Sequence, residues 1–424
     1  MKILHTSDWH LGRSLYGRRR QAEFARFLDW LAETLAEEEI DLLLVAGDVF
    51  DSTTPGTGSQ ELYYRFLRRA AEICRHIVIT AGNHDSPTFL EAPKSLLKAL
   101  GVHVIGTAAG AEQELLLLKD AAGRPEILVA AVPYLRDREI RTATAGESIA
   151  DKERKLIEGI RDHYAALAEA ARRIQARLEN DVPVIATGHL FAAGGRVIDG
   201  DGVRNLYIGS LGRFPAAEFP ALFSYIALGH LHQPQTVDGH SRIRYSGSPL
   251  AQGFGEADRK KCLLKVEFNN PGTEPEITEL PVPVFQPLAR LHGDREEIKT
   301  RLRELLKEDQ PIFLEITYEG AEPAGNLREE LEELIENRRI EILNLRNPGA
   351  LEAAKLGLGE ADENGESLDA LDPEEVFERR LAAGGVPEEL RPELRAAYRE
   401  IVTALNEKDR LAETDGAEKT DEDT

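Results

Sequence analysis

Short, nearly continuous apolar runs alternate with longer amphipathic segments over the first 270 residues of the chain. Such runs are typical of strands in a sheet that is covered on both faces. In one of the segments between them, apolar residues from Phe24 to Leu35 recur at spacings that define one face of a helix. The alternation predicts an α/β fold with helices packed on sheets. The apolar runs are Ile3–Leu4, Leu42–Val45, Ile77–Ile79, Val102–Ile105, Ile127–Val132, Val184–Ala186 and Tyr225–Leu228.

A second helical pattern covers residues 147–179, and the alternation changes at the proline-rich stretch PVPVFQP, residues 281–287. Beyond that stretch the pattern predicts a small β-α-β domain. A linker rich in Gly, Ala, Glu and Asp follows it, and then two amphipathic helices, the first of which begins at Asp372 and Pro373. The acidic end of the chain is predicted to be disordered. The predicted units are residues 1–280, 281–345, 346–371, 372–405 and 406–424.

Composition limits the environment and the substrates. The chain has 424 residues with 52 Lys and Arg against 75 Asp and Glu, a net charge of −23, which excludes a generally basic coat for nucleic acid but not a local patch. Adaptation to salt is an alternative interpretation of this acidity. No apolar run is long enough to span a bilayer, so no membrane contact is expected. Two cysteines without CxxC spacing, Cys74 and Cys262, favour the cytoplasm.

Five of the apolar runs are followed at once by residues that bind metals, in the segments LHTSDWH, LVAGDVF, ITAGNHD, IATGHLF and IALGHLH. Ligand sites of open α/β sheets lie beyond the carboxyl ends of the strands, so these side chains are expected to converge on one pocket. Glycine precedes the ligand in four segments and permits a tight turn and a close approach. The predicted ligands are Asp8, His10, Asp48, Asn83, His189, His230 and His232, with His84 and Asp85 beside them.

Carboxylate, amide oxygen and imidazole ligands suit Mn²⁺, Fe²⁺ or Zn²⁺. Seven ligands are too many for one ion, so we expect two divalent ions that share one carboxylate. Such a pair activates water for phosphoester hydrolysis. The sequence contains neither a GxSxG nucleophile elbow nor a GxxxxGK[ST] phosphate-binding loop, which argues against a serine hydrolase and against ATP hydrolysis by this chain.

These segments resemble the calcineurin-like metallophosphoesterases. Together with YIGSLGRFPA, YIALGHLHQPQ and RYSGSPL they look like the SbcD family of bacterial nuclease subunits, counterparts of the Mre-type nucleases of double-strand-break repair. The resemblance covers residues 1–270 closely and the rest more loosely. It implies a sandwich of two β-sheets flanked by helices, followed by a DNA-flanking capping domain, a linker and helices that bind a partner.

The resemblance also implies roles for single residues. Asp8, His10, Asp48 and His232 would hold one metal ion, with Mn²⁺ the expected metal, and Asp48, Asn83, His189 and His230 would hold the second. His84 would contact the scissile phosphate and assist the leaving group, with Asp85 orienting its ring. Asp51 stands where archaeal and eukaryotic relatives tend to have histidine, a departure that fits the bacterial branch of the family.

The family activity that the resemblance implies is 3′→5′ exonuclease action on duplex ends and endonuclease action on hairpins or single strands, in repair, recombination and replication of DNA. ATP would act through an SbcC-like ATPase with a coiled coil. The chain would form a homodimer within a heterotetramer near the nucleoid, for which residues 60–73 and 88–100 are candidate contacts.

Two surfaces are candidates for these partners. Arg13, Arg18, Arg19 and Arg20 follow the first ligand pair and are predicted to contact DNA phosphates, with a solvated loop as the equal alternative. The run Arg259–Lys261 is expected to be a solvated turn. The C-terminal helices cannot bury an apolar face alone, so they either bind a partner or fold back on this chain. Their apolar residues are Val376, Phe377, Leu381, Leu390, Leu394, Tyr398, Ile401 and Leu405.

Two other functions use the same residues. A phosphatase or cyclic-nucleotide phosphodiesterase would need the metal site but has no clear need of residues 280–405. A scaffold that only tethers DNA ends would have no need of seven ligands and His84.

Overall fold

The computed structural model describes residues 1–141, 147–195, 213–269, 273–308, 310–320, 324–336 and 338–348. It also describes nine positions near the C-terminus, which are residues 377, 378, 381, 388, 391, 392, 394, 395 and 398.

Two six-stranded sheets form the main body. In the first sheet, β1, β4, β5 and β6 run parallel, and β13 and β14 complete one edge in antiparallel fashion. Its strands, in spatial order, are β14 (Glu276–Pro281), β13 (Cys262–Glu267), β1 (Lys2–Thr6), β4 (Leu42–Ala46), β5 (His76–Thr80) and β6 (Val102–Ile105).

The second sheet is also built around four parallel strands. Strands β8, β9, β10 and β12 are parallel, and an antiparallel strand pairs at each edge. In spatial order the strands are β11 (Gln235–Val237), β12 (His240–Tyr245), β10 (Tyr225–Gly229), β9 (Val184–His189), β8 (Pro125–Ala130) and β7 (Leu115–Lys119).

Alternate residues of the central strands serve two cores, which explains why their sequences are continuously apolar. Leu42 and Leu44 of β4 face the core between the two sheets, where Ile185 and Tyr225 of the second sheet also lie. Leu43 and Val45 face the helices on the outer side instead. Because both faces of these strands pack against apolar cores, polar side chains that are to meet in one site are best placed at the strand ends.

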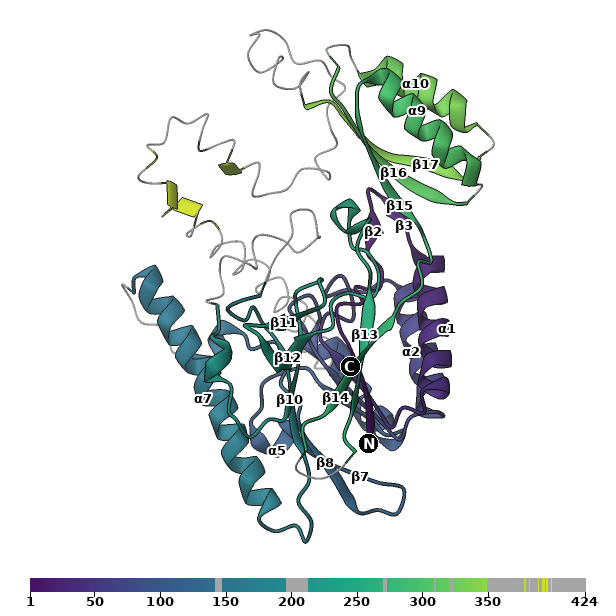
Figure 1. The fold of residues 1–424 in the computed structure, drawn as a ribbon. Helices are drawn as coiled ribbons and strands as arrows, with labels where there is room; N and C mark the ends of the chain where they lie inside the picture. Colours follow the sequence, from purple (N-terminus) through teal and green to yellow (C-terminus); the bar gives the residue numbers. More distant parts are fainter. Residues whose placement is uncertain are drawn as a thin grey trace, which may run out of the picture.

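Helices cover the outer face of each sheet (Figure 1). The predicted apolar face of the first helix, from Phe24 to Leu35, is buried against the first sheet, and the second long helix covers the second sheet. The helices of the main body are α1 (Gln21–Glu37), α2 (Thr57–Ala71), α3 (Pro87–Glu91), α4 (Lys94–Ala99), α5 (Ala111–Glu114), α6 (Asp137–Ile140) and α7 (Ile149–Gln175), with the short turns η1 (Ala216–Glu218) and η2 (Phe254–Glu256).

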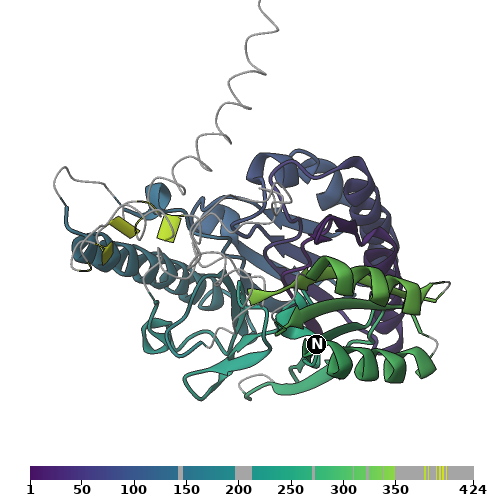
Figure 2. The same cartoon turned by 90° about the horizontal axis from the view of Figure 1, so that it is seen from above.

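A separate three-stranded parallel sheet, here called the cap, follows the main body and has its own apolar core. Viewed from above, the cap lies over the first sheet and its helices rather than over α7 (Figure 2). It consists of β15 (Leu288–Gly293), α9 (Arg295–Leu305), η3 (Leu306–Glu308), β16 (Ile312–Tyr318), α10 (Ala324–Ile335) and β17 (Ile340–Arg346).

A small hairpin joins the main body to the cap. Its strands, β2 (Ser14–Leu15) and β3 (Arg18–Arg19), are connected through Tyr16 and Gly17, both at positive φ, as a tight hairpin turn requires. The Tyr16 hydroxyl donates to the Glu315 carboxylate of the cap at 2.9 Å. The hairpin therefore connects the segment that follows the first predicted ligands with the cap.

The predicted partner-binding segment is described only in part. Val376, Leu390, Ile401 and Leu405 lie outside the described residues. Among the described positions, the rings of Phe377 and Tyr398 stack with centroids 4.0 Å apart, Leu381 is buried and Leu394 is 39% exposed. The two ring faces therefore cover each other.

Candidate metal centre

The structure brings the seven predicted ligands together at the carboxyl ends of five parallel strands. Asp8 and His10 follow β1, Asp48 follows β4 and Asn83 follows β5. In the second sheet His189 ends β9, and His230 and His232 follow β10. All seven side chains are buried. The centre therefore lies where the ends of the two sheets meet.

The polar atoms of these side chains face one another at short distances. Oδ2 of Asp48 lies 3.3 Å from Nε2 of His189 and 3.7 Å from Nε2 of His10. Oδ1 of Asn83 lies 3.0 Å from Nε2 of His189 and 3.1 Å from Nδ1 of His230. The Asp48 carboxylate thus lies between His10, which follows a strand of the first sheet, and His189, which ends a strand of the second sheet.

Three groups of side chains have donor atoms within 4.8 Å of one another and could each hold an ion. Asp8, His10 and His232 form one group, in which the Nε2 atoms of the two histidines are 3.1 Å apart. Asp8, Asp48 and His189 form another, and the third is His10, Asp48 and His84. Asp8, His10 and Asp48 each belong to two of these groups.

Backbone strain is concentrated in the same residues. The backbone φ values of Asp8, His10, Asp48 and His230 are 53°, 46°, 51° and 101°, in a region that residues other than glycine rarely adopt. Such conformations cost of order 1–3 kcal/mol each and persist at functional sites where the surroundings enforce them. Here backbone bonds enforce them, since the Asp8 N–H donates to the Gly47 carbonyl and the His10 N–H to the Asp48 carbonyl, both at 3.0 Å.

The glycines before the ligands permit a close approach, as the sequence predicts. A Cβ at Gly82 would lie 2.1 Å from Oδ1 of Asp48, and one at Gly47 would lie 2.2 Å from Nδ1 of His189. Neither position can therefore carry a side chain without moving a ligand.

The burial of so many ionisable groups changes their affinities for protons. Burial alone would lower the pKa of His189, but the Asp48 carboxylate raises it to about 9. Burial and the nearby His189 lower the pKa of His230 to about 3. Burial opposes ionisation of Asp48, yet His189 and His84 hold its pKa well below the usual range. The centre therefore holds an anionic Asp48 and a neutral His230 at neutral pH.

This donor set fits divalent cations. It offers carboxylate oxygens, an amide oxygen and imidazole nitrogens in a buried space, the mixture that Mn²⁺, Fe²⁺ and Zn²⁺ accept. Nε2 of His230 is buried and has no hydrogen-bond partner among the described residues. A buried polar atom in that state needs a partner, and a bound cation would provide one.

The structure corrects the expected role of Asp85. Its carboxylate accepts hydrogen bonds from the backbone N–H groups of Val49, Phe50 and Gly82, at 3.1, 2.9 and 2.8 Å. Asp85 therefore ties the loops after β4 and β5 together. The His84 ring is held instead at Nδ1 by the carbonyl of Asp51, at 3.0 Å.

Asp51 contacts the centre with its side chain as well. Its Oδ1 lies 3.4 Å from Nδ1 of His10 and 3.4 Å from Nη1 of Arg13. His84 reaches the same region, because its ring lies 4.9 Å from that of His10 and its backbone N–H donates to Oδ1 of Asp48. Burial lowers the pKa of His84 to about 4. Asp51 thus contacts both His10 and His84 from outside the ligand set.

The four arginines of the predicted DNA-contacting run have different surroundings. Arg20 is buried and donates two hydrogen bonds to Glu23, at 2.7 and 2.9 Å, so the prediction that it contacts DNA is wrong. Arg18 pairs with Glu341 of the cap at 3.1 Å. Arg13 pairs with Asp51 beside the centre, and Arg19 is exposed.

Lys261 is also unlike its prediction. Its side chain is 7% exposed and forms an ion pair with Glu256 at 2.9 Å, so it is not part of a solvated turn. Sequence alone gives no sign of this, because the ammonium group also contacts the carbonyl oxygen of His232 and Oγ of Ser248, which belong to other segments of the chain.

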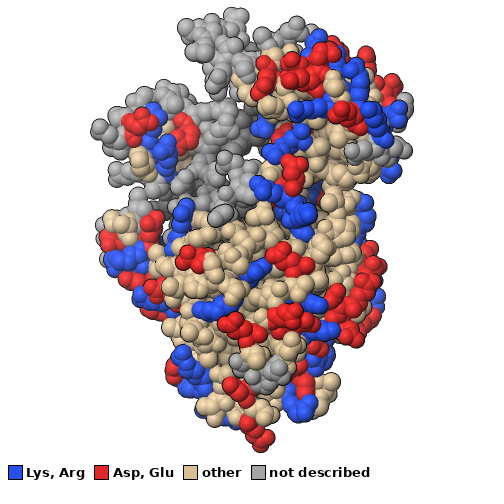
Figure 3. All heavy atoms as spheres, viewed as in Figure 1, with Lys and Arg blue, Asp and Glu red and all other residues tan. Residues whose placement is uncertain are grey.

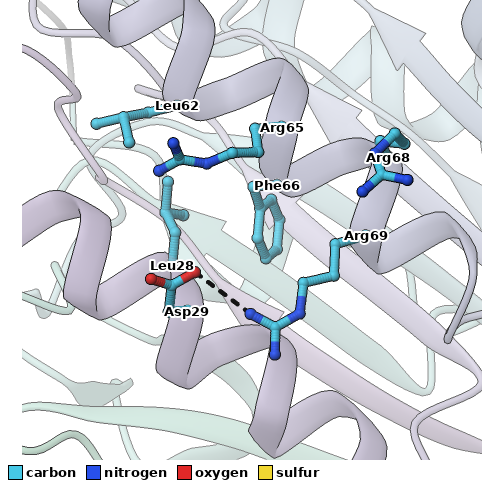
Figure 4. Close-up of a pocket in the computed structure, with 7 residues that line it drawn as sticks. All are labelled: Leu28, Asp29, Leu62, Arg65, Phe66, Arg68 and Arg69. Atoms are coloured by element: carbon cyan, nitrogen blue, oxygen red, sulfur yellow. Dashed lines mark hydrogen bonds and ion pairs between the residues drawn. The ribbon is translucent and has the colours of Figure 1, made fainter.

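Charge on the surface is mixed. Lys and Arg side chains gather below the cap on the face shown in Figure 3, and Asp and Glu gather along the edge formed by α1. A separate pocket of about 180 Å³ lies between α1 and α2 and is lined by Leu28, Phe66 and Arg69 among others (Figure 4). None of the seven predicted metal ligands lines this pocket. Among the described helices, none is long and apolar enough to cross a membrane.

Comparison with known families gives two matches. Residues 1–234 match the family described as calcineurin-like phosphoesterase. Residues 284–384 match the family described as type 5 capsule protein repressor C-terminal domain, whose short name is SbcD_C.

Three curated relatives are named as the SbcD component of the nuclease SbcCD. The Escherichia coli K12 protein is 37% identical over 384 residues, which are 90% of this chain and 93% of that protein. The Rhodobacter capsulatus protein is 35% identical over 361 residues, or 81% and 87% of the two chains. The Bacillus subtilis protein is 35% identical over 296 residues, or 68% and 72%.

Proposed function

The chain belongs to the SbcD family of calcineurin-like nucleases, and from that membership we propose that it is the two-metal DNA nuclease component of an ATP-driven complex. The observation that carries the proposal is the meeting of seven buried ligands from five strand ends around Asp48. A protein that only tethered DNA ends would have no need of strained backbone at four of these positions.

Two Mn²⁺ ions are the proposed cofactors. Asp8, His10 and His232 would hold one ion, Asn83, His189 and His230 the other, and Asp48 both. When bound, such ions activate a water molecule and stabilise the charge that develops on the phosphoryl oxygens.

The role of His84 follows from its hydrogen bond. A carbonyl oxygen only accepts, so the bond to Asp51 places the proton of neutral His84 on Nδ1. Nε2 then takes up a second proton when a phosphodiester anion lies beside the ring, because the negative charge favours the imidazolium. We propose that this proton is passed to the leaving oxygen.

DNA is the proposed substrate, cut as a 3′→5′ exonuclease on duplex ends and as an endonuclease on hairpins or single strands. In this acidic chain the phosphate contacts must be local, and Arg13 and Arg19 remain candidates from the arginine run. Arg18 and the hairpin would instead hold the cap beside the DNA.

The proposed partner is an SbcC-like ATPase with a coiled coil, bound through the C-terminal helical segment of residues 372–405. Support comes from the names of the relatives and from the lack of a phosphate-binding loop in this sequence. We propose a homodimer within a heterotetramer, acting in the cytoplasm at the nucleoid.

The test is hydrolysis of a 3′-labelled linear duplex by the purified chain with Mn²⁺, beside a small phosphodiester. Shortening of the duplex that a chelator abolishes is the expected result. Hydrolysis of the small ester alone would favour the phosphodiesterase alternative. If neither substrate is hydrolysed, the assay is repeated with the ATPase partner. Cleavage of the duplex would then show that the chain needs the partner, and continued inactivity would favour a chain that binds DNA without cutting it.

A further inference from the structure

A buried lysine lies directly behind the metal centre. Lys261 comes just before β13, and its side chain is 7% exposed. Lysine is almost never buried unless its charge is paired. Its ammonium group contacts the carbonyl oxygen of His232 at 3.1 Å, Oγ of Ser248 at 2.9 Å and Oε2 of Glu256 at 2.9 Å. Each of the three N–H donors of the ammonium group therefore has an acceptor.

The segment that contains Gly247 and Ser248 also contacts the backbone of His232. The Ser248 N–H donates to the same carbonyl oxygen at 3.1 Å. Gly247 has a φ of 73°, and a Cβ at this position would lie 2.7 Å from that oxygen. Only glycine allows the backbone to come so close. On the ring side, Oε1 of Glu256 lies 3.9 Å from Nδ1 of His232. Both the backbone and the ring of this histidine are thus contacted.

The same segment reaches a second residue of the centre. Oγ of Ser246 lies 2.9 Å from Oγ of Ser7, which in turn donates to Oδ2 of Asp8 at 2.5 Å. Ser246, Ser7 and Asp8 are fully buried. Asp8 and His232 belong to one candidate ion group with His10. The segment RYSGSP, residues 244–249, therefore lies against two members of that group.

Stability alone does not explain the Lys261–Glu256 pair. Apolar residues of similar volume in place of a buried ion pair often leave stability unchanged or raise it. Groups that orient metal-binding histidines have a different effect, since their loss typically weakens metal binding 10- to 100-fold. A buried ammonium group that donates to the carbonyl oxygen of His232 and is paired with Glu256 is suited to that task.

We propose that Lys261 and Glu256 are positioning residues that hold His232 in the orientation required to bind its metal ion. The proposal rests on the proposed metal centre and deepens it. It also gives the RYSGSP segment a physical role, which is to shape the backbone around His232 and to support Asp8 through two serines.

Isothermal titration of the full chain with Mn²⁺, combined with urea unfolding, tests the proposal. The variants are Lys261→Met, Glu256→Gln and the double variant that carries both. Each single substitution leaves one buried charge without its partner and is expected to destabilise the fold. The double variant removes both charges, so it is expected to recover stability while one Mn²⁺ site stays about 10-fold weaker.

Glu23→Gln is the matched control, because Glu23 is a buried carboxylate paired with Arg20 and does not contact the centre. It is expected to lose stability and to keep the Mn²⁺ affinity of the wild type. Ser248→Ala, which changes no charge, is expected to lower the affinity by a smaller factor and to fold normally.

Wild-type Mn²⁺ affinity in the double variant, or affinity that follows stability across all variants including Glu23→Gln, would overturn the positioning role. A wild-type chain that bound no Mn²⁺ would contradict the metal centre itself, and this proposal with it.

Discussion

Arg20 is expected to stabilise the fold and to contribute nothing to DNA binding. Its guanidinium donates to both carboxylate oxygens of Glu23, and the two side chains are 1% and 6% exposed. The guanidinium also lies over the ring of Phe24, with Cζ 5.6 Å from the ring centroid. Arg20→Ala would leave a buried carboxylate without its cation.

The size of the effect follows from this burial. Removing one partner of a buried ion pair costs about 3–5 kcal/mol, whereas an exposed pair is worth about 0–1 kcal/mol. Unfolding in urea is therefore expected to become about 10²- to 4 × 10³-fold more favourable for Arg20→Ala, taking 1.4 kcal/mol for each factor of ten. Arg20→Met combined with Glu23→Leu, which removes both charges, is expected to recover most of the loss.

DNA affinity measured as a function of salt concentration provides the contrast. Arg20→Ala is expected to keep the wild-type slope at a temperature where it remains folded. Arg19→Ala, at an exposed position, is expected to reduce the slope by about 1, the effect of one lost phosphate contact. An Arg20→Ala variant with wild-type stability and a reduced slope would refute the reasoning.

Three further results are expected from the geometry of the centre. The pKa of His189 is raised to about 9 in the metal-free chain, so Mn²⁺ binding at pH 7.5 should release at least one proton and should become tighter as the pH rises towards 9. Calorimetry in two buffers of different ionisation enthalpy measures the number of protons released. Mn²⁺ binding without proton release would contradict this prediction. Gly82→Ala should weaken Mn²⁺ binding, because the new Cβ would lie 2.1 Å from Oδ1 of Asp48, whereas Gly56→Ala, with no atom within 4 Å, should leave binding unchanged. Asp85→Asn loses part of a set of three hydrogen bonds to the backbone, each worth about 1.5–3 kcal/mol, so it should lower the midpoint of thermal unfolding. A midpoint equal to that of the wild type would argue against the structural role of Asp85.

The ligand positions could be predicted from the sequence because each follows its own strand. An apolar run marks the strand, and parallel strands bring their carboxyl ends to one edge, so His189 and His230 could be placed near Asp48 although they are far away in the chain. The central strands could be predicted for the same reason. Strand β14 could not be recognised from an apolar run, since it has an exposed face with polar residues.

The hydrogen-bond and ion-pair partners of polar side chains could not be predicted from the sequence. Arg20 appears as one of three consecutive arginines, yet it is buried because Glu23 follows one helical turn later. Asp85 stands next to His84 in sequence, but three backbone N–H groups bind its carboxylate. Lys261 depends on acceptors from three segments. Spacing along the chain does not specify such contacts, because they arise only when the loops pack.

The most direct test of the metal centre separates metal binding from cleavage. His84→Gln and Asp48→Asn would be compared with the wild type for Mn²⁺ affinity and for the rate at which they shorten a linear duplex. His84→Gln should bind Mn²⁺ normally and cut at least about 100-fold more slowly, as expected when a proton donor is lost. Asp48→Asn should lose both binding and cleavage. Duplex cleavage that survives both substitutions, or that continues after chelation of the metal, would contradict the account.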